Sequence, residues 1–237
     1  AKGFGLTFGW HTRIDDRVQH ITEAVKAGNI YVNRNQIGAI VGSQPFGGEG
    51  LSGTGPKAGG PAYVARFRAV STPTAPARGG KGADPVQVQA ALNKAVTDTL
   101  KRRSTESLPG PTGESNRLSI FARGTVLCLG PTEEAAAEQV RIAEWAGCKA
   151  VAVAPGAEID GVLQAEALTD LQGFAVVAYD GPQDPARAIR TALAARDGRL
   201  IPLTSRADLA AMCRLERHVC IDTTAAGGNA SLLAAAS

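Results

Sequence analysis

The spacing of apolar residues near the start of the chain predicts a strand, a helix and a second strand. Residues 4–12, FGLTFGWHT, mix apolar and small side chains as a strand does. Residues 29–33, NIYVN, are typical of a short β-rich run, and Gly28 suits the left-handed position just past a helix end. Between these runs, apolar residues recur at steps of four, three and four, which marks one helical face at Ile14, Val18, Ile21 and Val25.

Later in the chain, helical faces alternate with apolar runs. A helix is predicted over residues 86–102, because Val88, Leu92, Val96 and Leu100 lie four apart, and the Pro- and Gly-containing segment 106–115 ends it. The apolar run 118–130 precedes Thr132, a suitable N-cap, and a helix that Gly147 ends.

Three further strands are predicted at residues 149–155, 173–180 and 200–205, with a helix between the last two. Asp184 is the expected cap of that helix, Pro185 its first residue, and Gly198 its end. Strands that alternate with helices indicate β-α-β units and a parallel sheet. The predicted fold class is therefore α/β, Rossmann-like in the second half.

A domain boundary is predicted where the apolar pattern stops. Residues 71–85, STPTAPARGGKGADP, are rich in proline, glycine and small side chains, as linkers are. This gives a first domain over residues 1–70, a linker over 71–85 and a second domain over 86–237.

Composition and charge exclude several classes of function. Of 237 residues, 25 are basic and 22 acidic, and this net charge of +3 is too small to favour binding to nucleic acid or an anionic membrane. No apolar run approaches the ~20 residues that a membrane-spanning helix needs. The chain also opens almost at once into strand-like sequence without a signal peptide. We expect a cytoplasmic segment cut from a longer protein.

The four cysteines offer neither a metal site nor a convincing nucleophile. Cys128, Cys148, Cys213 and Cys220 are scattered through apolar runs, and no C-x-x-C pair or histidine cluster accompanies them. Buried free thiols are the better interpretation. Cys148 is the least unfavourable candidate nucleophile. His11, His20 and His218 are isolated in sequence, and surface or strand-end roles are expected for them.

The glycine-rich stretch Gln44–Pro61, QPFGGEGLSGTGPKAGGP, has the bare pattern of a nucleotide-binding loop without its context. Gly48, Gly50 and Gly53 match G-x-G-x-x-G, but Thr54-Gly55-Pro56 cannot promptly open the helix that the pyrophosphate requires. Phe46 instead suggests an aromatic wall beside free backbone N–H groups, which form a nest for an anion. A small substrate with a carboxylate at one end suits such a site. Glu49 beside it is expected to be a solvated loop carboxylate.

Four segments resemble the C-terminal part of the proline utilization A family within the aldehyde dehydrogenase superfamily: GLTFGWHTR, GNIYVNRN, VGSQPFGGEGLSGTGPKAGGP and TTAAGGNASLL. Members of that family join an FAD-dependent proline dehydrogenase to an NAD-dependent L-glutamate γ-semialdehyde dehydrogenase. The resemblance implies that residues 1–68 end an aldehyde dehydrogenase catalytic domain. Both cofactors would be bound mainly by residues outside this chain.

The resemblance also assigns substrate-binding roles within residues 35–48. The backbone N–H groups of Gly38 and Ala39 would hold the substrate's α-carboxylate, and Phe46 would pack against its aliphatic chain. The family's catalytic cysteine has no counterpart here, so no catalytic residue is assigned and the isolated chain is expected to be inactive.

Residues 124–156 resemble a coenzyme-binding β-α-β unit of the same superfamily in their succession of strand, helix and strand. Where that unit usually has lysine after the strand, this chain has Gly130 or Leu129, and no ribose-binding acid is evident. The resemblance therefore implies a non-catalytic cover domain that closes the intermediate's passage, in a protein expected to form a homo-oligomer. The alternative is a stand-alone α/β module that binds a nucleotide or a partner. Nucleic-acid binding is disfavoured.

Overall fold

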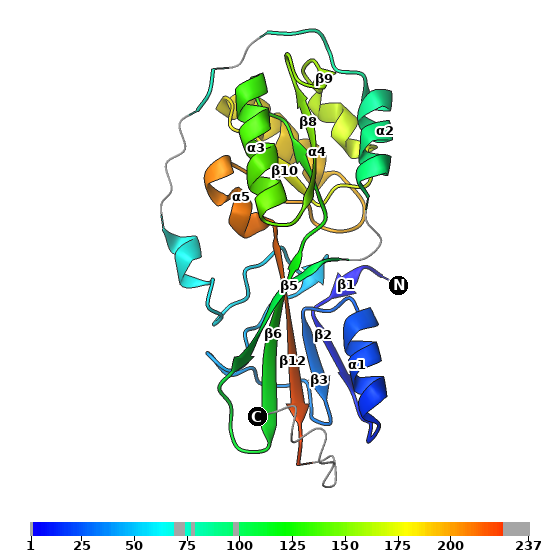
Figure 1. Cartoon of the computed structure of the whole chain (residues 1–237), viewed down its shortest axis with the longest axis vertical. Coiled ribbons are helices and arrows are strands. Elements are labelled where there is room, and N and C mark those ends of the chain that lie inside the picture. Colours follow the sequence, from blue (N-terminus) through cyan, green and yellow to red (C-terminus); the bar gives the residue numbers. More distant parts are fainter. Residues whose placement is uncertain (1, 69–73, 77–78, 97–99, 225–237) are drawn as a thin grey trace. The chain divides into compact units, whose positions relative to one another are not determined.

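The computed structural model describes residues 2–68, 74–76, 79–96 and 100–224. The chain folds into two compact units, and Figure 1 labels most of their elements. Unit 1 comprises residues 1–68, 102–121 and 215–237, and unit 2 comprises residues 69–101 and 122–214, each as far as the structure describes it.

Unit 1 is built on a mixed sheet with the strand order β2-β3-β12-β6-β5 in the described part of the chain. β3 pairs in parallel with both β2 and β12, whereas β5 and β6 form an antiparallel pair. On helix α1 (Asp15–Ala24), Val18 joins Ile30 and Val32 in a buried cluster against the sheet. The strands are β2 (Thr7–Trp10), β3 (Asn29–Val32), β5 (Arg102–Leu108), β6 (Glu114–Ala122) and β12 (Arg214–Asp222).

Three short elements surround the glycine-rich stretch of unit 1. β1 (Phe4–Gly5) pairs antiparallel with β4 (Glu49–Gly50), and a 3-10 turn η1 spans Val64–Phe67. The glycines here let backbone approach backbone. A Cβ on Gly28 would lie 1.9 Å from the carbonyl oxygen of Gly47, so no other residue fits there without displacement.

Unit 2 contains a parallel sheet with the order β11-β10-β7-β8-β9 among its described strands. In chain order this is 5-4-1-2-3, the strand order of a Rossmann-type sheet, in which the first and fourth strands are neighbours. The strands are β7 (Thr125–Cys128), β8 (Lys149–Ala154), β9 (Ile159–Asp160), β10 (Val176–Ala178) and β11 (Leu203–Thr204).

Helices bury the two faces of this sheet separately. Leu127 and Val177 lie in one cluster with α2 and α4, whereas Val126 and Val176 lie in another with α3 and α5. This alternation is the period of two that a buried strand requires. The helical elements are α2 (Pro85–Ala95), α3 (Glu133–Trp145), η2 (Ala165–Thr169), α4 (Gln183–Ala194) and α5 (Arg206–Met212).

The α/β class and the parallel sheet of the second half are confirmed. Thr132 caps α3 as predicted, since its hydroxyl accepts a hydrogen bond from the N–H of Ala135 at 3.2 Å. The helix after residue 180 begins earlier than predicted, with Pro182 at its N-cap and Asp184 in its first turn. None of the described helices is long and apolar enough to cross a membrane.

Two predicted elements were wrong. The helix expected over residues 86–102 ends at Ala95, and residues from Arg102 to Leu108 form an exposed strand whose hairpin turn is the segment predicted as a break. The apolar run 118–130 is two strands that belong to different sheets, β6 and β7, separated at Gly124 with φ of +126°.

The units also differ from the sequence-based domain boundaries. Residues 102–121 and the described residues from 215 onward lie in unit 1, because β12 pairs with β3 from His218 opposite Asn29 to Ile221 opposite Val32. The first unit thus takes strands from both ends of the chain. Most of the TTAAGGNASLL segment, residues 225–233, lies outside the described residues.

Candidate functional site

The backbone around Phe46 is fixed on both sides of the residue. The N–H of Phe46 donates to the carbonyl of Ala58 at 2.9 Å, and the N–H of Ala58 donates back at 2.8 Å. The Phe46 side chain is half-buried. Its ring is therefore held by a rigid turn and still has surface available to a ligand.

Asn29 brackets this turn from the start of β3. Its side-chain amide donates to the carbonyl of Pro45 at 2.8 Å, and its Oδ1 accepts from the N–H of Gly47 at 3.1 Å. The same Oδ1 accepts from Nζ of Lys57 at 2.9 Å, and Lys57 also donates to the Gly47 carbonyl. One fully buried amide thus fixes the residues on each side of Phe46. Sequence reasoning missed Asn29, although a polar residue that opens a buried strand demands internal partners.

The ammonium group of Lys57 is buried, with only 2% of the residue exposed. Desolvation lowers the pKa of Lys57 to about 7, although the carboxylates of Glu216 and Glu49 act in the opposite direction. Its neighbour His218 is fully buried on β12, and desolvation lowers the pKa of that imidazole to about 4. The surface or strand-end role expected for His218 was therefore wrong, since the residue is buried in the middle of β12.

Lys57→Met is expected to remove a pH dependence of stability. Between the folded pKa of about 7 and the ordinary value of 10.5, the unfolded chain binds a proton at Lys57 that the folded chain does not. The free energy of unfolding therefore rises with pH in that window, by up to about 1.4 kcal/mol per pH unit from this group. Urea unfolding of both proteins at pH 7, 8 and 9 measures the difference. Lys26→Met, at an exposed lysine, is the control and should leave the pH dependence of the unfolding free energy unchanged. The same pH dependence in the parent and in Lys57→Met would contradict the lowered pKa of Lys57.

Residues 35–43, here called the anchor loop, contain Gly38 and Ala39. Both residues are exposed, and Gly38 adopts a φ of +79°. Within the described residues, neither amide N–H has a hydrogen-bond partner. These N–H groups can therefore receive an acceptor from a ligand. The structure gives no contact between them and Phe46, so their joint action on one ligand stays a prediction.

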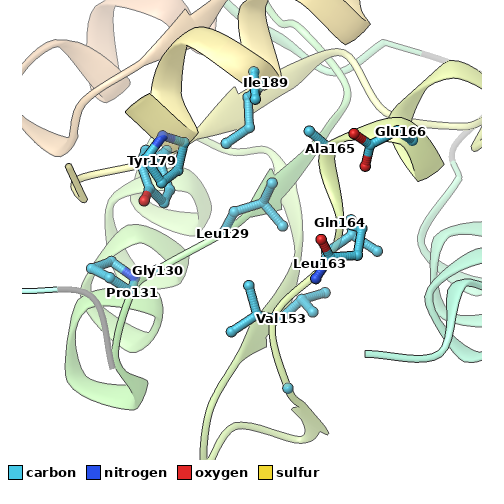
Figure 2. A pocket seen from close by; sticks show the side chains of 14 residues that line it. Leu129, Gly130, Pro131, Val153, Leu163, Gln164, Ala165, Glu166, Tyr179 and Ile189 are labelled. Atoms are coloured by element: carbon cyan, nitrogen blue, oxygen red, sulfur yellow. The ribbon is translucent and has the colours of Figure 1, made fainter. Parts of the chain in front are cut away.

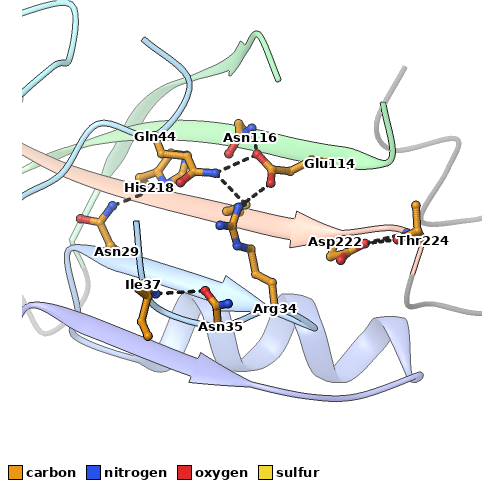
Figure 3. Close-up of polar contacts among 11 residues, drawn as sticks. Asn29, Arg34, Asn35, Ile37, Gln44, Glu114, Asn116, His218, Asp222 and Thr224 are labelled. Carbon is orange, nitrogen blue, oxygen red and sulfur yellow. Dashed lines mark hydrogen bonds and ion pairs between the residues drawn. The ribbon is translucent and has the colours of Figure 1, made fainter. Parts of the chain in front are cut away.

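The two residues that flank the anchor loop meet at one carboxylate (Figure 3). Arg34 donates to Oε2 of Glu114, and Gln44 donates to Oε1 of the same residue at 2.8 Å. Asn116, also on β6, donates to Oε1 at 2.8 Å. Burial raises the pKa of the adjacent Cys220 thiol to about 12, so this sulfur stays protonated at neutral pH.

Glu49 is not the solvated loop carboxylate that the sequence suggested. It is buried, and Arg217 on β12 donates to it twice, from Nε at 3.0 Å and from Nη2 at 2.9 Å. A carboxylate held in this bidentate pair stabilises the fold and is poorly placed to act as a general base.

The prediction that Gly48, Gly50 and Gly53 do not form a nucleotide-binding loop is confirmed. Such a loop needs a helix that opens at its third glycine, and the first described helical turn after Gly53 begins only at Val64.

The cysteines and acidic residues form neither an accessible thiol nor a cluster of metal ligands in the described part of the chain. All four thiols are free and buried, which confirms the sequence-based interpretation. A hydrogen bond with Cys213 lowers the pKa of the Cys148 thiol, but Cys148 is only 5% exposed and cannot reach a substrate. No group of three or more potential metal ligands lies together among the described residues.

Unit 2 holds a separate cavity of about 290 Å³ at the carboxyl ends of its strands (Figure 2). It lies where β7 and β10 are neighbours, the switch point at which sheets of this order usually bind ligands. Its walls are mainly apolar, with Gln164 and Glu166 as polar side chains. The apolar walls include Leu129, Val153, Leu163, Tyr179 and Ile189.

The chemistry of this cavity does not fit the phosphates of a dinucleotide. Its lining includes no lysine or arginine, and the first turn of α3 carries Glu133 and Glu134. Pro131 lacks the N–H that a phosphate would bind. A Cβ on Gly130 would lie 2.3 Å from the backbone nitrogen of Ala136, so this glycine serves close packing of helix on strand.

Comparison with known proteins gives relatives for nearly the whole chain. Residues 1–72 match the aldehyde dehydrogenase family. In an alignment 276 positions long, the chain is 37% identical to the bifunctional protein PutA of Escherichia coli (strain K12). This alignment covers 98% of this chain and 21% of that protein. It is 50% identical over 62 residues to a 1-pyrroline-5-carboxylate dehydrogenase of Bacillus cereus (strain B4264), covering 26% of this chain and 12% of that protein.

A solved structure matches as well. Proline utilization A (PutA) from Corynebacterium freiburgense is 25% identical with a TM-score of 0.57, over 93% of this chain and 23% of that chain. The chain thus spans 21% and 22% of the length of two curated relatives it matches.

Proposed function

We propose that the chain forms part of a bifunctional enzyme that oxidises proline to glutamate, because residues 1–72 match the aldehyde dehydrogenase family and nearly the whole chain aligns with PutA. Its own contribution is one wall of an NAD-dependent glutamate semialdehyde dehydrogenase site. NAD and the FAD of the proline dehydrogenase are bound mainly by residues outside this chain. The observation that carries the proposal is the rigid Phe46 turn next to a loop with two unpaired amides.

The wall acts on the substrate by binding and orienting it. The N–H groups of Gly38 and Ala39 donate to the α-carboxylate, and Phe46 shields the aliphatic chain from water. These contacts lie away from the reacting carbonyl, so they bind the ground state and the transition state alike. Bound NAD would supply the hydride acceptor. The four cysteines of this chain are buried, so the described residues supply no nucleophile and we expect the chain alone to show no turnover.

We assign unit 2 a non-catalytic role, as a cover that closes the passage of the intermediate. Its buried thiols and its phosphate-unfavourable cavity support this assignment over a second dehydrogenase site. The remaining catalytic domains of the same protein would be its partners, in a homo-oligomer.

Phe46→Ala tests the wall in the full-length protein. We expect the KM for glutamate semialdehyde to rise about tenfold with kcat within about twofold, because only uniform binding of the aliphatic chain is lost. Phe67→Ala is the matched control, since that ring is 74% exposed on η1. Equal KM values for Phe46→Ala and the parent protein would refute the proposal that Phe46 contacts the substrate.

A second candidate function rests on the cavity of unit 2. A stand-alone module could bind a small ligand there, and the apolar lining favours an uncharged ring compound over a nucleotide with phosphates. Calorimetry of the chain with adenosine, adenine nucleotides and NAD separates the candidates. Tight binding of any of these compounds would favour the ligand-binding module. The absence of a binding heat with all of them would favour the non-catalytic cover domain.

A further inference from the structure

The anchor loop begins and ends on the same carboxylate. Arg34 immediately precedes the loop and Gln44 immediately follows it, and both donate to Glu114 on β6, Gln44 at 2.8 Å. Figure 3 shows the two side chains converging on Glu114 from opposite ends of the loop. Glu114 therefore closes the loop at its base through two charge-assisted hydrogen bonds.

The surroundings leave this arrangement little freedom. Gln44 and Asn116 are 1% and 2% exposed, and the side chains of Arg34 and Glu114 are 18% and 13% exposed. The guanidinium of Arg34 also lies 5.5 Å from the ring centroid of Tyr31 and 3.3 Å from Sγ of Cys220. Contacts in so dry an environment are stronger and more directional than the same contacts in water.

By contrast, the loop itself has little internal support. Ile37 and Val41 are 81% and 84% exposed, and a Cβ built on Gly38 would meet no atom within 4 Å. Its backbone contacts include a hydrogen bond from the N–H of Gly42 to the carbonyl of Gly59 at 3.1 Å and one from the N–H of Gln44 to the carbonyl of Ile40 at 2.8 Å. The conformation at Gly38 and Ala39 thus depends strongly on how the loop ends are held.

We propose that Glu114 is a positioning residue that clamps both ends of the anchor loop and so holds the N–H groups of Gly38 and Ala39 ready for a carboxylate. This inference rests on the proposed function of the loop. Glu114 lies beyond residues 1–72, the part that matches the aldehyde dehydrogenase family. The β5–β6 hairpin thereby gives the later part of the chain a direct influence on substrate binding.

The test uses Glu114→Ala and Glu114→Gln in the full-length protein, with two separate readouts. Hydrogen exchange of the Gly42 and Gln44 amides, which donate to the carbonyls of Gly59 and Ile40, should become about tenfold faster in Glu114→Ala, because the loop opens without unfolding the core. The KM for glutamate semialdehyde should rise about tenfold, with kcat and the KM for NAD within about twofold, since a preorganised binding loop is lost. Glu114→Gln keeps an acceptor for Gln44 and loses the charge that faces Arg34, so its effects should be smaller.

Glu106→Ala is the matched control, because Glu106 is an exposed carboxylate on the same hairpin. Unchanged exchange of the Gly42 and Gln44 amides in both Glu114 variants would overturn the clamp, whatever the values of KM and kcat. Faster exchange with an unchanged KM would overturn the role in positioning, and would count against the proposed function of the loop. If Glu114→Ala does not fold, the same comparisons are made with Glu114→Gln.

Discussion

Glu49→Ala is expected to lower the free energy of unfolding by about 3–5 kcal/mol, because it leaves a buried charge without its partner. Arg217 is only 7% exposed, and its guanidinium donates two hydrogen bonds to Glu49. It also lies 5.2 Å from the ring centroid of Phe121, which offers far weaker compensation than a carboxylate. Urea unfolding of the chain measures the loss.

The matched control for this prediction is Glu23→Ala. Glu23 pairs with Arg102 at 3.0 Å, but both side chains are about half exposed, at 49% and 47%. Solvent screens such a pair, so we expect a loss below about 1 kcal/mol. Similar losses in the two variants would show that the Glu49–Arg217 pair is hydrated and would contradict its structural role. Replacing Glu49 and Arg217 together by leucine should cost less than Glu49→Ala alone.

Asn29→Ala is expected to lower the free energy of unfolding by about 3 kcal/mol, since it removes a partner from two buried groups and one part-buried group. The Pro45 carbonyl, the Gly47 N–H and the Lys57 ammonium all lose a hydrogen bond to this one side chain. The same variant should raise the KM for glutamate semialdehyde in the full-length protein, because the turn that presents Phe46 loosens.

Asn29→Asp distinguishes the two kinds of contact. It keeps the acceptor for Gly47 and Lys57 but loses the donor to Pro45, so we expect it to recover part of the stability. Asn93→Ala, at an exposed asparagine on α2, is the control and should change stability by less than about 0.5 kcal/mol. If Asn29→Ala loses no more stability than this control, Asn29 does not hold the turn that presents Phe46.

The sequence predicted elements wherever a local signal is strong. Thr132 at a helix start and the apolar strands of unit 2 needed only neighbouring residues to be recognised. The strand Arg102–Leu108 was missed because its side chains are almost all exposed and polar, and its partner β6 alone makes it a strand. The break at Gly124 was missed because both sides of it are apolar, although they belong to different sheets.

The site shows the same division between local and distant information. Phe46 between proline and glycines was visible in sequence, whereas Gly38 and Ala39 were assigned only through the family resemblance. Arg34 and Glu114 are 80 positions apart, and Lys57 and Glu216 are 159 apart. A single sequence carries no pattern that joins such pairs, so the side chains that hold the site became evident only in the fold.

The most direct measurement is a structure of the full-length protein with glutamate, the product, bound. The account predicts that one carboxylate of glutamate accepts hydrogen bonds from the backbone N–H groups of Gly38 and Ala39 while its methylene carbons contact the ring of Phe46. Glutamate bound at another place, with these amides turned to solvent and the ring bare, would contradict it.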